Sequence, residues 1–390
     1  MRLHPFARPL DAVLAQARPI DTLLPVGTDR PKAHHVVDGI VAVVRAMVLY
    51  AVGAPFELEE RPVPRPAPDE ALIKVRACGA GLTVHHAKVG TSPATLPVIM
   101  GHEIAGEIVA LGSAVQGLEI GDRVTPHFYL FCGRCRYCLT MREPLCENTG
   151  GYIGRQRDGG YAEYVALPAR NLIKIPAELP YDAHPEEVAV ICDAIATPYK
   201  VTRRARIRPL EDVLVIGAAG GVGIHMVQLA RFFQARVLAA DRGEAKLDAA
   251  KSAGAHETID ALVGPIDAQA RKLTDGRGAD VVVDFVASPE TLQAGLAALA
   301  PGGRLAILGV HRDSRFNVDP LWMLNGEREV IGSRYVTRQE IVDALELVRR
   351  GHIRPIVTRI FALEEAEQAH ELLGQGATIG RAALVMDSET

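Results

Sequence analysis

Residues 213–223 read Val-Leu-Val-Ile-Gly-Ala-Ala-Gly-Gly-Val-Gly, and this stretch decides the fold. Its four leading apolar residues predict a short buried strand, its glycines predict a tight turn, and the apolar residues after it predict a helix to about Phe233. The alternation continues with predicted strands at 236–240, 281–285 and 305–308 and a predicted helix at 246–253. Strands that alternate with helices indicate a parallel, doubly wound α/β sheet.

The glycine-rich turn is a candidate phosphate-binding site, because a helix N-terminus presents free backbone N–H groups and the positive end of its dipole. Ala218 holds the first glycine position of the Gly-x-Gly-x-x-Gly pattern, and only the other two positions are glycine. Asp241 ends the next strand, where an acidic residue hydrogen-bonds the adenosine ribose and repels the 2′-phosphate of NADP; Arg242 beside it is a residue type that holds this phosphate. We therefore predict NAD rather than NADP, bound by Gly217, Gly220, Gly221, Val222, Gly223, Asp241, Arg242 and Lys246.

The first half of the chain has a different pattern of apolar residues. Short strand-like segments separated by glycine and proline predict a partly closed β-barrel, with strands at 47–50, 72–77, 106–111, 123–126, 161–166 and 172–175. From about Tyr335 the chain has helical periods at 341–348 and 364–373 and a last strand at 382–386. Residues 1–45 have scattered prolines and no long helical period. They are either a mobile tail or the product of a mis-assigned start codon, or else an arm that forms oligomers.

Four of the six cysteines form the pattern Cys132-x-x-Cys135-x-x-Cys138-x7-Cys146. Tetrahedral zinc takes four thiolates, and a gap of two residues lets neighbouring cysteines turn onto one ion. All four coordination positions are then filled by protein, so the pattern predicts a structural zinc that holds a lobe with little core of its own. An iron–sulfur cluster is the alternative for this type of ligand.

Bulk composition excludes several function classes. The 390 residues carry a net charge of −4, which gives no reason to expect nucleic acid as a partner. No apolar run approaches the roughly 20 residues that span a bilayer, and no signal peptide is evident, so we expect a cytoplasmic protein without a membrane partner.

Together these pieces resemble the zinc-containing alcohol dehydrogenases of the medium-chain dehydrogenase/reductase superfamily, from Met47 to Met386. Further markers are Gly101-His102-Glu103, Cys192 five residues before Thr197, Pro301-Gly302-Gly303-Arg304 and Gly380-Arg381. The resemblance implies a GroES-like catalytic domain (46–193, with the zinc lobe at 132–146), a Rossmann domain (194–334) and a C-terminal segment that completes the catalytic domain (335–390). It also implies a small-molecule substrate, a homodimer or homotetramer, and Arg381 near the cofactor pyrophosphate.

The resemblance implies a catalytic zinc that polarises the substrate oxygen, with His102 and Cys192 as two ligands and Glu103 close by. The first ligand, a cysteine in the family, is Gly81 here, and the aspartate that usually supports the histidine ligand is Val84. Three interpretations follow. Zinc binds through His102, Cys192 and Glu103 with water; His85 or Cys78 supplies the missing donor; or no catalytic metal is present, as in relatives that reduce the activated double bonds of enones, quinones or acyl-CoA thioesters.

Thr83 and His86 match the hydroxyl and imidazole that carry the alcohol proton away in the family. This favours an NAD-dependent, zinc-type alcohol dehydrogenase with Thr83, His86 and Glu103 as candidate catalytic residues. The alternatives are a zinc-independent NAD(P)H-dependent enone, quinone or enoyl-CoA reductase and a catalytically inactive dinucleotide-binding protein. A basic run, 203–208, is either a solvated helix end or a contact to a phosphate-bearing substrate.

Overall fold

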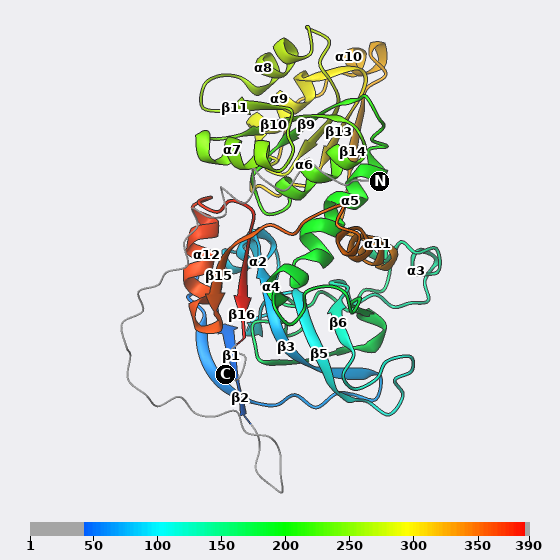
Figure 1. Cartoon of the computed structure of the whole chain (residues 1–390), viewed down its shortest axis with the longest axis vertical. Helices are drawn as coiled ribbons and strands as arrows, with labels where there is room; N and C mark the ends of the chain where they lie inside the picture. Colours follow the sequence, from blue (N-terminus) through cyan, green and yellow to red (C-terminus); the bar gives the residue numbers. More distant parts are fainter. Residues whose placement is uncertain (1–42, 387–390) are drawn as a thin grey trace, which may run out of the picture.

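The computed structural model describes residues 43–386. The predicted extension lies outside the described residues except for Val43–Arg45, which form the first part of strand β1 (Val43–Leu49). The chain is arranged in two regions, with a parallel sheet and its helices in one and mostly antiparallel strands in the other (Figure 1). No helix among the described residues is long and apolar enough to cross a membrane.

The parallel sheet confirms the predicted doubly wound fold. Its strand order is β11-β10-β9-β12-β13-β14, and every pairing in it is parallel. This is the order of a dinucleotide-binding sheet, in which the strand order reverses beside the first strand. The strands are β9 (Asp212–Ile216), β10 (Arg236–Asp241), β11 (Glu257–Asp260), β12 (Ala279–Asp284), β13 (Leu299–Ile307) and β14 (Glu329–Gly332).

Two apolar cores cover the two faces of this sheet. Val213 and Val215 face one core, whereas Leu214 and Ile216 face the other, as the alternation of side chains along a strand requires. The first core includes residues of α5 (Ala196–Arg204), α6 (Gly223–Phe232) and α7 (Glu244–Ser252); the second includes residues of α8 (Ile266–Leu273), α9 (Pro289–Ala297) and α10 (Pro320–Asn325). A strand buried on both faces explains why β9 is apolar throughout.

The other region is built from a seven-stranded sheet and a three-stranded sheet. The larger one has the order β15-β16-β3-β5-β6-β8, with β7 paired to β3, and the smaller one has the order β2-β1-β4. The strands besides β1 are β2 (Glu57–Pro62), β3 (Glu70–Ala80), β4 (Val98–Ile99), β5 (Glu103–Leu111), β6 (Arg123–Pro126), β7 (Tyr164–Pro168), β8 (Leu172–Lys174), β15 (Val357–Ala362) and β16 (Arg381–Val385).

The end of the chain returns to this second region, as Figure 1 shows. Strand β16 pairs with β3, so the C-terminal segment completes the sheet that the first half of the chain began. The helices here are α2 (Leu82–Lys88), α3 (Arg136–Leu139), α4 (Pro185–Ala189), α11 (Arg338–Arg349) and α12 (Ala366–Gly374), with short 3-10 turns at Glu143–Leu145, Ala169–Asn171 and Leu363–Glu365. A π-helical turn, Ile191–Ile195, joins α4 to α5 between the two regions.

Candidate active site

Three acidic or imidazole side chains meet where the two regions join. His102 precedes β5, Glu103 opens it, and Asp193 lies in the π-helical turn. One donor atom from each lies within 4.8 Å of the others, and all three residues are buried. His102 Nε2 is 3.1 Å from Asp193 Oδ2, and the Thr197 hydroxyl donates to Asp193 Oδ1 at 2.5 Å. Burial lowers the pKa of His102, although Asp193 acts in the opposite direction.

Arg381 joins this cluster from the start of β16. Its Nε donates to Glu103 Oε2 at 3.0 Å, a second nitrogen pairs with Glu103 Oε1, and the same nitrogen is 3.7 Å from Asp193 Oδ2. Burial lowers the pKa of Arg381 to about 10, so the guanidinium is charged at neutral pH. Two buried carboxylates therefore share one buried cation.

Gly79, in β3, and Gly81, between β3 and α2, make room for this ion pair. A Cβ atom at Gly79 would overlap the Glu103 side chain, and a Cβ atom at Gly81 would overlap the guanidinium of Arg381. Gly81 is the residue that the family resemblance aligns with the first metal ligand. The space beside it, which a ligand side chain would need, is therefore filled by Arg381.

The residues present do not fit a catalytic zinc while Arg381 lies in this place. Gly81 supplies no donor, and the carboxylates that would bind the metal already neutralise a cation. A Zn²⁺ ion about 4 Å from the guanidinium would be repelled by about 8 kcal/mol at an effective dielectric constant near 20. Glu103 and Asp193 can compensate either cation, but not both in full.

The structure places Asp193, not Cys192, in the donor cluster. The Cys192 thiol points to the carbonyl of Ala189 at 3.4 Å, and burial raises its pKa to about 12. His85 and Cys78, the predicted substitutes for the missing ligand, are also outside the cluster. The His85 ring stacks on His370 with centroids 6.0 Å apart, and Cys78 Sγ lies 3.7 Å from the carbonyl oxygen of Gly79.

Helix α2 carries the predicted proton-relay residues, Thr83 and His86. They are three positions apart, which puts them on one face of the helix. Both residues are half-buried, and burial lowers the pKa of His86 to about 4, with His85 and Arg155 adding repulsion. His86 is therefore a neutral imidazole at pH 7, and Val84 between them is buried in the core.

The glycine-rich turn has the free donors that a pyrophosphate requires. Among the described residues, the backbone N–H groups of Gly221, Val222 and Gly223 donate to no partner. Asp241 accepts the N–H of Ala219 at 2.9 Å and lies 3.6 Å from Lys246 Nζ. These features fit a dinucleotide whose pyrophosphate lies at the start of α6 and whose ribose meets Asp241.

The same turn is close to Arg381. The N–H of Gly380 donates to the Ala219 carbonyl at 2.8 Å, and a Cβ atom at Gly221 would come within 2.8 Å of Arg381 Nη1. Arg381 thus lies between the predicted pyrophosphate position and the acidic cluster, and its charge is directed to the cluster.

The four cysteines of the lobe lie close together. Sulfur–sulfur distances are 3.5 Å between Cys135 and Cys138 and 3.9 Å for two further pairs, Cys132–Cys138 and Cys135–Cys146. Four sulfurs about 2.3 Å from a tetrahedral zinc are about 3.8 Å apart. Backbone N–H groups lower the pKa of Cys132 and bring that of Cys135 to about 6, whereas burial raises the pKa of Cys146 and brings that of Cys138 to about 12. The lobe fits a zinc ion with all four positions filled.

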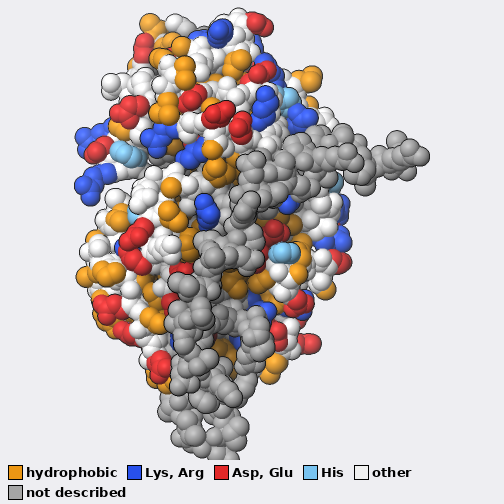
Figure 2. Space-filling model, turned by 60° about the vertical axis from the view of Figure 1, so that its left-hand side comes forward, with side chains coloured by type: hydrophobic (Ala, Val, Ile, Leu, Met, Phe, Trp, Pro, Cys, Tyr) orange, Lys and Arg blue, Asp and Glu red, His pale blue; other side chains and the backbone are white. Residues whose placement is uncertain are grey.

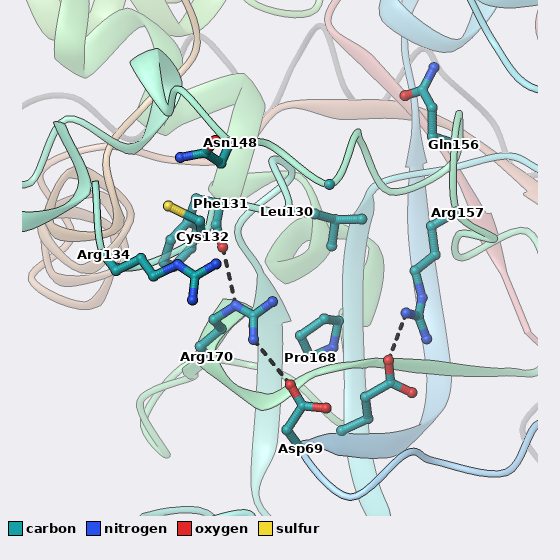
Figure 3. A pocket seen from close by; sticks show the side chains of 12 residues that line it. Asp69, Leu130, Phe131, Cys132, Arg134, Asn148, Gln156, Arg157, Pro168 and Arg170 are labelled. Atoms are coloured by element: carbon teal, nitrogen blue, oxygen red, sulfur yellow. Dashed lines mark hydrogen bonds and ion pairs between the residues drawn. The ribbon is translucent and has the colours of Figure 1, made fainter. Parts of the chain in front are cut away.

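A cavity of about 740 Å³ lies beside this lobe, apart from the cluster. Arg170 forms an ion pair with Asp69 at 3.1 Å and donates a hydrogen bond to the carbonyl of Phe131, as the dashed lines in Figure 3 mark. Arg157 pairs with Glu70 at 2.6 Å. Most charges in this cavity are therefore already compensated. Acidic and basic side chains are also interspersed over the face shown in Figure 2.

The basic run at the end of α5 is held by the protein itself. Arg206 pairs with Glu329, Arg204 donates to the Gly332 carbonyl at 3.2 Å, and Arg203 lies 3.8 Å from Glu340. These contacts give the run a structural role between α5 and the strand β14.

Sequence reasoning did not identify Asp193 or Arg155 as site residues. Asp193 is the one charged residue in the apolar run 188–196, and a lone carboxylate in such a run indicates a buried polar site. Arg155 lies in a segment rich in glycine and aromatic residues, where nothing in the sequence distinguished it from a surface arginine.

Comparisons with known proteins show the family to which the chain belongs. Residues 67–177 match the alcohol dehydrogenase GroES-like domain, and residues 221–350 match the zinc-binding dehydrogenase family. The chain is 34% identical to the NAD-dependent alcohol dehydrogenase of Sulfurisphaera tokodaii, over 88% of this chain and 100% of that protein. It is 32% identical to the acryloyl-coenzyme A reductase of Metallosphaera sedula, over 87% of this chain and 99% of that protein.

Among solved structures, that of AibC superposes with a TM-score of 0.82 at 34% identity, covering 91% of this chain and 99% of AibC. The antiparallel region is thus a GroES-like domain, and the parallel sheet belongs to a Rossmann-like domain. Members of the family act on small molecules. The chain belongs to the zinc-containing alcohol dehydrogenase family of the medium-chain dehydrogenase/reductase superfamily, and it is an NAD(P)-dependent oxidoreductase of that type.

Proposed function

We propose that the chain uses NADH to reduce a carbon–carbon double bond conjugated to a carbonyl group, as in an enone or an enoyl thioester. The observation that carries this proposal is the guanidinium of Arg381, which fills the ligand space beside Gly81 and neutralises Glu103 and Asp193. Alcohol oxidation in this family relies on a Lewis acid at this place. A conjugated double bond is already activated by its own carbonyl group, so it suits a site without one. The similarity to acryloyl-coenzyme A reductase supports the same reaction.

In this proposal the residues of the chain have separate roles. The free N–H groups of Gly221, Val222 and Gly223 bind the pyrophosphate, and Asp241 binds the ribose, which favours NAD over NADP. NADH supplies the hydride when bound. Thr83 and His86 conduct the proton that completes the reduction, with the neutral His86 imidazole able to accept at one nitrogen and donate from the other.

A second candidate function, zinc-dependent alcohol oxidation, is favoured by the donor atoms of His102, Glu103 and Asp193, which lie within 4.8 Å of one another. The similarity to the alcohol dehydrogenase of S. tokodaii supports it as well. For this function Arg381 would have to leave both carboxylates. It predicts two zinc ions per chain, whereas double-bond reduction predicts one.

The test combines turnover with metal content on protein purified without added metal. We expect NADH oxidation with acryloyl-coenzyme A, crotonyl-coenzyme A or methyl vinyl ketone, no NAD reduction with a panel of primary and secondary alcohols, and one zinc per chain by elemental mass spectrometry. Alcohol turnover with two zincs per chain would overturn the proposal in favour of the second candidate. Cofactor binding without turnover of either class would point to a catalytically inactive dinucleotide-binding protein.

We also propose that Cys132, Cys135, Cys138 and Cys146 bind one structural zinc, supported by their spacing. A homodimer or homotetramer, as the family resemblance implies, is likewise a proposal, and sedimentation velocity would measure it.

A further inference from the structure

Arg155 is a second arginine of the site, beside the acidic cluster and the relay helix. We propose that its guanidinium binds the carbonyl oxygen of the substrate and stabilises the negative charge that develops there during hydride transfer. This inference rests on the proposed function, because the negative oxygen arises in double-bond reduction as an enolate. It makes Arg155 a catalytic residue of this chain.

The backbone holds Arg155 next to the cluster. Gly154 packs so closely on the backbone of Gly101, the neighbour of His102, that a Cβ atom at Gly154 would come within 2.8 Å of Gly101 N. From there Arg155 Nη2 donates to the carbonyl of Thr83 at 2.9 Å. Arg155 therefore spans from the His102 side of the site to the helix that carries the relay residues.

Aromatic rings line the same place. The Arg155 guanidinium lies 5.8 Å from the centroid of the Phe128 ring and 5.9 Å from that of Tyr152. Phe128 in turn packs against the His102 ring, with centroids 4.1 Å apart and an angle of 31° between the ring planes. Rings on this side of the guanidinium exclude water and strengthen its interaction with an oxygen that approaches it.

The charge of Arg155 has no carboxylate partner among residues 43–386. Within this part of the chain, its Nε is buried and has no hydrogen-bond acceptor. Asp193, the carboxylate that acts on it electrostatically, is occupied by His102, Thr197 and Arg381. A half-buried cation without a carboxylate partner is unfavourable unless a ligand supplies the negative charge.

The chemistry of the proposed reaction supplies that charge. The β-carbon of the double bond accepts hydride from NADH, the π electrons form the α-carbon–carbonyl-carbon double bond, and the carbonyl oxygen becomes an enolate oxygen. Protonation of the α-carbon, with a proton from solvent conducted by Thr83 and His86, restores the carbonyl group and leaves NAD⁺. A guanidinium fixed on the oxygen lowers the barrier because it is already oriented before the charge appears.

Two variants and a matched control test this assignment. Arg155→Met removes the charge, Arg155→Lys keeps it without the planar fork, and Arg134→Met makes the same change at an exposed arginine of the zinc lobe. For crotonyl-coenzyme A reduction we expect kcat to fall by about 10²–10³-fold in Arg155→Met, by less in Arg155→Lys and not at all in Arg134→Met. The Kd for NADH, measured by fluorescence, should be unchanged in all three.

A binding measurement separates this role from a structural one. Crotonate and crotonamide share a carbon skeleton, but only crotonate carries a negative oxygen at neutral pH. By calorimetry, the wild-type complex with NAD⁺ should bind crotonate about tenfold more tightly than crotonamide, and Arg155→Met should abolish this preference. If Arg155 only joins its loop to α2, the variant will unfold at a lower temperature while the preference and kcat stay near wild type, which would overturn the inference.

The two proposals fail in different ways. If the wild type turns over no enone or thioester but its crotonate preference depends on Arg155, the proposed reaction is wrong and the anion-binding role stands. If the wild type reduces crotonyl-coenzyme A and Arg155→Met does so within threefold of its rate, the reaction stands and the role of Arg155 is wrong.

Discussion

The zinc lobe and the acidic cluster look alike as sets of possible ligands and differ in charge. The lobe has four thiol groups, 3.5–3.9 Å apart in the pairs Cys135–Cys138, Cys132–Cys138 and Cys135–Cys146. Among residues 43–386 no arginine or lysine side chain donates a hydrogen bond to these sulfurs. The cluster has His102, Glu103 and Asp193 within 4.8 Å, but Arg381 lies on both carboxylates.

The difference teaches that donor atoms alone do not define a metal site. A site must also leave space for the ion and leave negative charge uncompensated. In the lobe four sulfurs lie close enough together to bind one metal ion. In the cluster one glycine, Gly81, removes a donor and at the same time admits a permanent cation.

The largest expected effect comes from breaking the lobe. Cys146→Ser should lower the zinc content from one ion per chain to none, because the remaining thiolates no longer close the tetrahedron. Elemental mass spectrometry measures this, and Leu139→Ser, an exposed change in the same lobe, is the control that should retain the metal. A residual zinc ion in Cys146→Ser would show that the cluster binds metal after all.

The next effect concerns the cation of the cluster. Arg381→Met leaves the Glu103 and Asp193 carboxylates buried without their partner, which should lower the free energy of unfolding by about 3–5 kcal/mol. Denaturant unfolding measures the loss. Arg381→Lys should lose less, and Arg359→Met, at an exposed arginine of β15, should be within about 0.5 kcal/mol of wild type. Equal stability of Arg381→Met and wild type would mean that the carboxylates find compensation elsewhere.

The third prediction concerns a double variant that should convert the acidic cluster into a zinc site. Combining Gly81→Cys with Arg381→Met restores a thiol and removes the competing charge, so the double variant should bind a second zinc per chain. Gly81→Cys alone should remain at one zinc, because its side chain must displace the guanidinium before a metal can enter. A second zinc in the single variant would show that the Arg381 guanidinium is readily displaced from the cluster.

Much of this fold follows from local pattern. Strands β9, β10, β12 and β13 coincide with predicted apolar segments, whereas β11 (Glu-Thr-Ile-Asp) has a single apolar residue and is not among the predicted strands. The four-cysteine spacing identifies its lobe directly. The Gly-His-Glu motif also predicts that His102 and Glu103 lie in the site. These features depend on residues close in sequence, which is why they are accessible without coordinates.

The decisive contact of the site is not local. Arg381 and Gly81 are 300 positions apart and meet only because β16 pairs with β3, so no spacing rule indicates that one fills the space left by the other. Cys192 and Asp193 illustrate a second arrangement that no local pattern predicts. They are adjacent, and the π-helical turn that sets which one faces His102 has no clear sequence signature.

The smallest expected effect tests that adjacent pair. Cys192→Ala removes a buried sulfur that points to the Ala189 carbonyl and away from the cluster. It should cost about 1 kcal/mol of stability and leave zinc content and turnover within threefold of wild type. Asp193→Asn should instead slow turnover, because His102 and Arg381 lose the charged partner that positions them. Steady-state kinetics on the two variants decide between them. If Cys192→Ala were the more impaired variant, or lost a zinc ion, the thiol would have to reach the cluster in the working enzyme. The lobe and the cluster would then differ in conformation rather than in charge.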